Sequence, residues 1–192
     1  MTVAATATLA TTGMAGADTP VRENNAAAHA VQVLNAAVTE SNALPDDFVA
    51  VMGYEPERQG GRLVNPGGSC SSPVPLPAEF DDACKAHDLG YDVLRYATAN
   101  DEELGPWARK ELDARLEADM HSACNSRTGD LDRAGCYVMA DVAAAAVTGN
   151  SWRQGYVTPT KESFLPYLLC GLGVVLSVAT AVFVRRENGA VS

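Results

Sequence analysis

Apolar side chains recur every three or four residues along most of the chain, which is the spacing of amphipathic helices. This spacing predicts helices over residues 24–38, 47–52, about 78–96, 106–123 and 137–147. Residues 60–77 lack the period and are rich in Gly, Ser and Pro, which indicates a long loop. Only a short turn at 101–105 separates the two longest helices. The pattern therefore predicts a mainly α fold with two antiparallel central helices.

The last apolar segment differs from these helices because it carries no charge. Residues 163–184 are uncharged and are followed directly by Arg185 and Arg186. A helix of this length can span a hydrocarbon core of about 30 Å, and arginines at its end favour the cytoplasmic side. The sequence therefore predicts a single transmembrane helix at 163–184 in the cell membrane. It also predicts an extracytoplasmic domain before the helix and a cytoplasmic tail at 185–192.

The first segment, residues 1–17, is rich in Ala and Thr and contains no acidic residue. Its last three residues, Ala15-Gly16-Ala17, fit a small-x-small cleavage site, but no basic residue precedes them. Two interpretations stay open: the end of a signal peptide, or a disordered N-terminus. The predicted organisation continues with an N-terminal helical region at 18–66, a catalytic domain at 67–150 and a linker at 151–162.

The charge balance narrows the classes of partner. The chain has 24 acidic and 14 basic residues and a formal net charge of −10. Nucleic-acid binding proteins normally carry a basic surface, so DNA or RNA binding is disfavoured. The acidic balance also argues against binding anionic membranes through bulk charge. Contact with lipid would then depend on apolar residues or on a local cation.

Five cysteines indicate a disulfide-linked domain. Cys70, Cys84, Cys124 and Cys136 form two close pairs in the polar part of the chain, and Cys170 lies in the apolar segment. No Cys-x-x-Cys or Cys/His zinc pattern is present, which argues against structural zinc. Two disulfides and an oxidising compartment fit better. Four cysteines allow three connectivities, of which pairing of sequence neighbours is the simplest.

Four unusual side chains share one face of the helix predicted at about 78–96. Cys84, His87, Asp88 and Tyr91 occupy positions i, i+3, i+4 and i+7. Burying polar groups without partners is unfavourable by several kcal/mol, so this face requires a metal, another acid or a substrate. The residues therefore predict a functional site.

The pattern Cys-x-x-His-Asp-x-x-Tyr resembles the active-site helix of secreted phospholipase A2, most closely that of the short prokaryotic and fungal branch. The resemblance covers residues 70–136. It implies that His87 is a general base for water, that Asp88 binds calcium, and that Tyr91 supports a second aspartate behind the histidine. It also implies the disulfides Cys70–Cys84 and Cys124–Cys136.

The second aspartate should come from the antiparallel helix. Asp113 stands where the prokaryotic relatives carry this acid, and Asp119 is a competing candidate on nearly the same face. We prefer Asp113 and interpret Asp119 as structural. The alternatives are that Asp113 is an ordinary exposed acid and that Tyr91 is a plain core residue.

The calcium loop departs from the family pattern. Relatives carry an Asp two residues before the first disulfide cysteine, but this chain has Gly68 there, followed by Ser69. Calcium would then depend on Asp88, the Ser69 carbonyl, and a further acid such as Glu79 or Asp81. One missing carboxylate predicts weak, millimolar affinity.

These features predict calcium-dependent hydrolysis of the sn-2 ester of glycerophospholipids by a His/Asp dyad that activates water. A second hypothesis is a catalytically weak or inactive scaffold that acts as a binding module at the cell surface. A third, a metal-dependent phosphohydrolase, would need further histidine ligands, and only His29 and His121 are present.

Overall fold

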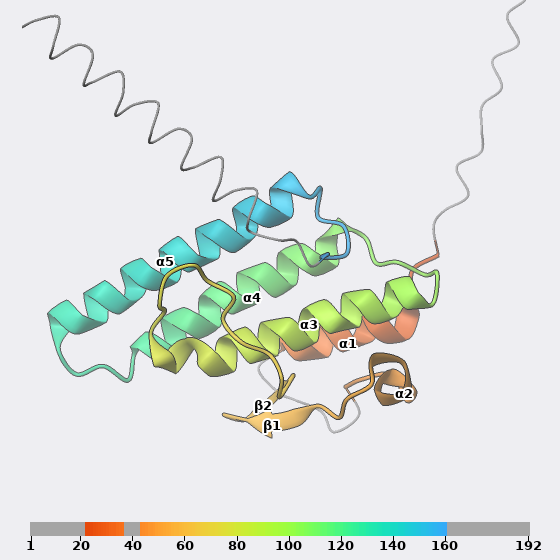
Figure 1. Cartoon of the computed structure of the whole chain (residues 1–192), viewed down its shortest axis with the longest axis horizontal. Helices are drawn as coiled ribbons and strands as arrows, with labels where there is room; N and C mark the ends of the chain where they lie inside the picture. The colour runs from red at the N-terminus through yellow and green to blue at the C-terminus, as the bar shows by residue number, and fades with distance from the viewer. Residues whose placement is uncertain (1–21, 37–42, 161–192) are drawn as a thin grey trace, which may run out of the picture. The chain divides into compact units, whose positions relative to one another are not determined.

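The computed structural model describes residues 22–36 and 43–160. The described elements are α1 (Asn25–Asn35), α2 (Phe48–Met52), β1 (Glu57–Gln59), β2 (Arg62–Val64), the 3₁₀ turn η1 (Ala78–Phe80), α3 (Asp81–Ala99), α4 (Pro106–Cys124) and α5 (Asp130–Arg153) (Figure 1). The mainly α fold predicted from the hydrophobic pattern is confirmed. The N-terminal residues 1–17, the segment at 163–184 and the tail at 185–192 lie outside the described residues, and the interpretations given to them stay predictions.

Helices α3 and α4 pack in antiparallel fashion, as the short connection predicted. Residues near the start of α3, such as Ala83, share a hydrophobic cluster with Met120 near the end of α4. Ala97 near the end of α3 packs in the same cluster as Ala108 near the start of α4. A Cβ on Gly90 would lie 2.4 Å from a Leu112 methyl group, so a larger residue at this position would force the Leu112 side chain to move.

Two disulfides fix the ends of these helices, and both predicted pairings are confirmed. Cys70–Cys84 ties the long loop to the first turns of α3, and Cys124–Cys136 ties the end of α4 to α5. In the entropy model, a closed loop of about 15 residues stabilises a domain by roughly 3 kcal/mol. The cystines also belong to the core, where they pack with Phe80, Leu116 and Ala140.

Helix α5 is longer than the sequence predicted. It begins at Asp130 instead of Tyr137 and continues through Arg153 instead of ending near residue 147, and Ser151 is fully buried. The sequence 148–150, Thr-Gly-Asn, is typical of a helix end, but packing against the rest of the domain keeps these residues helical. Residues 151–158, which the sequence assigned to a linker, therefore include part of the folded domain.

A β-hairpin that the sequence did not predict precedes the long loop. Strands β1 and β2 pair antiparallel, with Glu57 opposite Val64 and Gln59 opposite Arg62. Gly60 and Gly61 form the two-residue turn with φ of 56° and 82°, a conformation that favours glycine. Strands of three residues are too short to show an alternating pattern, which explains why neither strand could be predicted from the sequence.

No helix within the described ranges combines the length and hydropathy needed to cross a membrane. The predicted span at 163–184 is not part of these ranges.

Candidate active site

His87 lies at the centre of the buried interface between α3 and α4. It is 9% exposed, and its Nε2 is 3.0 Å from Oδ1 of Asp113 on α4. A carboxylate accepts the Nε2–H, so this contact favours the tautomer in which Nδ1 carries the lone pair. The pair thus has the geometry of an oriented general base. Helix packing brings together the two residues that the sequence proposed as a dyad.

Tyr91, one turn beyond His87, binds the same carboxylate. Its hydroxyl donates to Asp113 Oδ1 at 2.6 Å and lies 3.2 Å from Ser151 Oγ. Burial raises the pKa of Tyr91 well above its usual value, and the neighbouring Asp113 charge adds to the effect. Tyr91 therefore stays a neutral hydrogen-bond donor.

Asp113 is ionised despite its burial. Burial alone would raise its pKa, but the hydrogen bonds from His87, Ser151 and Tyr91 together outweigh it, so the pKa of Asp113 lies below its usual value. A carboxylate stabilised by several donors in this way remains charged and holds the imidazole in place.

The sequence did not single out Arg109 and Ser151, which complete this network. Arg109 is 1% exposed, and its Nε donates to the Tyr91 hydroxyl at 3.2 Å. Its Nη1 donates to the Val157 carbonyl at 2.7 Å, and the guanidinium lies 5.1 Å from the centre of the Tyr91 ring. The position of Arg109, one helical turn before Asp113, was the available sequence signal. Ser151 gave none, because α5 was expected to end before it.

Asp88 faces the long loop instead of α4. Its Oδ2 accepts the backbone N–H of Ser69 at 2.9 Å. A Cβ at position 68 would lie 2.7 Å from the same oxygen, so Gly68 lets the loop backbone approach the carboxylate closely. Burial raises the pKa of Asp88 above its usual value, although the Ser69 N–H opposes this.

The other acids considered for calcium are bound elsewhere. Glu79 forms an ion pair with Arg127 at 2.5 Å, and Asp81 pairs with Lys85 at 2.7 Å. Asp92, one turn beyond Asp88, is the nearest further carboxylate on that side of α3. It accepts hydrogen bonds at 2.8 Å from Tyr54 and from Asn65, and it pairs with Arg95.

These contacts provide one side-chain carboxylate, Asp88, for the calcium site that the resemblance implied. Calcium requires several oxygen ligands, whereas the described loop offers Asp88 one N–H and no second carboxylate. Ser69 directs its amide to Asp88, and the ligand role proposed for its carbonyl stays a prediction.

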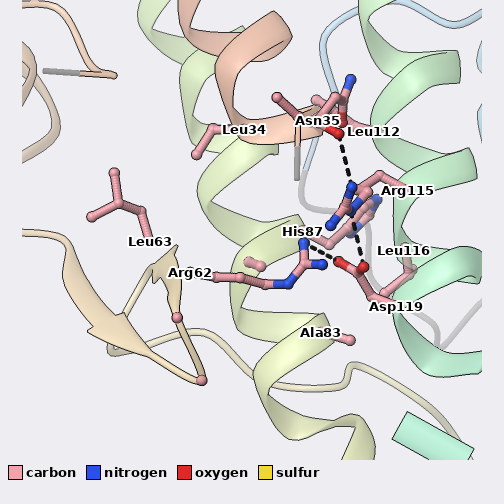
Figure 2. A pocket seen from close by; sticks show the side chains of 14 residues that line it. Leu34, Asn35, Arg62, Leu63, Ala83, His87, Leu112, Arg115, Leu116 and Asp119 are labelled. Atoms are coloured by element: carbon pink, nitrogen blue, oxygen red, sulfur yellow. Dashed lines mark hydrogen bonds and ion pairs between the residues drawn. The ribbon is translucent and has the colours of Figure 1, made fainter. Parts of the chain in front are cut away.

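A cavity of about 270 Å³ lies next to His87. It is bounded by the end of α1, the hairpin turn, α3 and α4, and Figure 2 shows charged side chains across it. Asp119 Oδ2 is 2.6 Å from Nη1 of Arg62, and its Oδ1 is 2.9 Å from Nε of Arg115. Asp119 therefore binds two arginines and is not the partner of His87.

Comparison with known families now adds to this geometry. A family model described as prokaryotic phospholipase A2 matches residues 55–150, half of the chain. The chain belongs to the prokaryotic phospholipase A2 family. The match includes the hairpin, the long loop, α3, α4 and most of α5. No curated protein and no solved structure matches the chain.

Membership of the phospholipase A2 family disfavours the metal-dependent phosphohydrolase. His29 is exposed on α1, and His121 pairs with Asp141 at 2.8 Å. Neither lines the cavity beside His87. Glu117, His121 and Asp141 have ligand atoms within 4.8 Å of one another, but Glu117 and Asp141 are exposed, and no further feature of the described residues indicates an ion there.

Proposed function

We propose that this protein hydrolyses the sn-2 ester of glycerophospholipids, with His87 as general base and Asp113 as the acid that orients it. The observation that carries the proposal is the buried chain of hydrogen bonds from His87 to Asp113 and Tyr91. It supports the proposal because His87 also lines a cavity, so the base adjoins space for a substrate.

The reaction needs no covalent intermediate. Nδ1 of His87 takes a proton from water, and the oxygen of that water attacks the ester carbonyl carbon. The tetrahedral intermediate then collapses, the C–O bond to glycerol breaks, and the imidazolium returns the proton to the departing alkoxide. The products are a fatty acid and a lysophospholipid. Asp113 stabilises the imidazolium while it exists, and we assign no step to calcium.

We further propose that the domain acts on the extracytoplasmic side of the membrane. Two disulfides close within the domain, and disulfides persist in oxidising compartments. The uncharged segment at 163–184 with its following arginines favours a tether of the same orientation.

The full chain in mixed phospholipid micelles provides the test. Fatty-acid release is measured with calcium and with chelator for the wild type, for His87→Ala and for the matched control His121→Ala. Release that falls by about 10²- to 10⁴-fold in His87→Ala and persists in His121→Ala is the expected result. No release by a folded wild type under either condition contradicts the hydrolase.

A second candidate function is a binding scaffold without activity. The lone carboxylate of Asp88 favours the scaffold, because this chain has Gly68 where the resemblance implies a second acid for the cation site. The micelle assay separates the two functions, since a scaffold would bind lipid without releasing fatty acid.

A further inference from the structure

Two arginines line the cavity that His87 also lines. Arg62 comes from β2 and Arg115 from α4, and both pair with Asp119. Figure 2 shows Arg62 extending from the hairpin across α3 toward α4. Because two guanidinium groups share one carboxylate, this group of three side chains retains a net positive charge.

The ion pairs leave hydrogen-bonding capacity in the cavity. A guanidinium has five N–H donors. Arg115 Nη1 donates to the Asn35 carbonyl at 2.8 Å, and its Nε lies 2.9 Å from Asp119 Oδ1. Among the described residues, Asn35 Oδ1 on the lining of the same cavity is buried without a donor. Guanidinium N–H groups and this acceptor make the cavity lining polar, which suits a polar ligand.

We propose that Arg62 and Arg115 bind the phosphodiester of the lipid substrate and that Asp119 positions them, an inference that rests on the proposed hydrolase function. Guanidinium groups bind phosphate oxygens through paired, charge-assisted hydrogen bonds. The side chains of Arg62 and Arg115 are 29% and 24% exposed, so a ligand can reach them.

Size and connectivity favour the lipid phosphate as the occupant. The cavity of about 270 Å³ is small for a whole ligand, since ligand pockets usually measure roughly 300–1,000 Å³. It suits the polar end of a phospholipid and leaves the acyl chains outside. In a glycerophospholipid the phosphate is only a few bonds from the sn-2 ester, so a phosphate held there brings the ester close to His87. With Asp88 of α3 as the one carboxylate beside the loop, the arginines supply fixed positive charge on this side of His87.

A substrate comparison tests the assignment. Steady-state kinetics are measured on a short-chain phosphatidylcholine and on an uncharged diester with the same acyl chains. We expect Arg62→Ala to raise KM for the phospholipid about tenfold, as the loss of a charged hydrogen bond predicts. Its kcat and its activity on the uncharged ester should stay close to wild type, and Arg62→Lys should recover part of the affinity.

The matched control is Arg58→Ala, which removes the same charge from the other strand of the hairpin outside the cavity lining. An equal loss on both substrates in Arg62→Ala would indicate a merely structural role and overturn the inference. An unchanged KM for the phospholipid would overturn it as well, and would leave the hydrolase function intact.

Binding without turnover separates this inference from the proposed function. A non-hydrolysable dialkyl ether phosphocholine and inorganic phosphate are titrated calorimetrically into the full chain. About tenfold weaker binding of the ether lipid by Arg62→Ala supports the site, even if the wild type hydrolyses no ester. Equal binding by the wild type and Arg62→Ala, or no binding by the wild type, overturns it. Inorganic phosphate that binds as tightly as the ether lipid would indicate a free-phosphate site and overturn the lipid assignment.

Discussion

The two sides of α3 carry adjacent residues with opposite surroundings. His87 faces α4, where Asp113 from α4 and Ser151 from α5 join it and Tyr91 in one hydrogen-bond network. Asp88, the next residue, faces the loop and has the Ser69 N–H as its hydrogen-bond donor. The network around Asp113 depends on helix packing, whereas the surroundings of Asp88 depend on loop residues that differ from the family pattern.

The two carboxylates show the consequence in their ionisation. Asp113 is buried and Asp88 is half-buried, and burial by itself raises a carboxyl pKa. The donors around Asp113 reverse the effect and lower its pKa, while the single amide at Asp88 does not. The larger number of hydrogen-bond donors around Asp113 thus explains why the two pKa values shift in opposite directions.

The largest effect should come from Asp113→Asn. The amide cannot hold the Nε2–H tautomer of His87 in the same way, so we expect kcat to fall by about 10²- to 10⁴-fold. Hydrolysis kinetics measure it, with Asp141→Asn as control, because Asp141 is an exposed acid that also bonds a histidine. Activity above half of wild type would show that His87 works without the buried network.

Tyr91→Phe should have the next largest effect. It removes the donor 2.6 Å from Asp113 and leaves the buried Arg109 Nε without its acceptor. We expect roughly tenfold lower kcat and about 1–3 kcal/mol lower free energy of unfolding. Chemical denaturation and kinetics measure the two quantities. Tyr137→Phe, whose hydroxyl bonds the exposed Asn125, should change neither.

Gly68→Asp would test the loop side by restoring the missing acid. The new Cβ would crowd Asp88 Oδ2, so we expect a lower Tm than wild type in chelator. In millimolar calcium the paired carboxylates should bind the ion and raise the Tm, since a ligand at 100 times its Kd adds about 2.7 kcal/mol.

The control for this substitution is Gly135→Asp on the exposed side of α5, where a Cβ meets no neighbour. A calcium response no larger in Gly68→Asp than in Gly135→Asp would show that the loop cannot form a calcium site even with two acids.

The smallest expected effect is a gain in stability in Asp88→Asn. Burial raises the pKa of Asp88 in the folded state above its ordinary value of 3.8. Ionising Asp88 is therefore less favourable in the folded state than in the unfolded state. As a result, the free energy of unfolding decreases as the pH rises through the folded-state pKa. Asp88→Asn removes this penalty, so the variant should have the higher Tm at pH 7 in chelator. The difference should vanish below about pH 3.8, where both states of the wild type are protonated.

Thermal melts across this pH range measure the effect. A variant less stable than wild type at pH 7 in chelator would mean that the Ser69 amide stabilises the ionised Asp88 more than burial disfavours it.

The sequence by itself determined the helical periodicity, the residue pattern of α3 and the simplest cysteine pairing. These features are local: a fixed 3.6-residue period sets which side chains share a face, and the short separation within each cysteine pair made neighbour pairing the simplest of three connectivities. The pattern around His87 and Asp88 was therefore readable before any tertiary contact was known.

Only the tertiary structure decided which distant groups complete the site. It brought Asp113 to His87 and gave Asp119 to two arginines, although both acids lie on α4. It also buried Ser151 beside Tyr91. Such pairings depend on the rotation and register of packed helices and on where a three-residue strand meets them. The 3.6-residue period of a helix does not encode these tertiary features, because they result from the packing of the whole core.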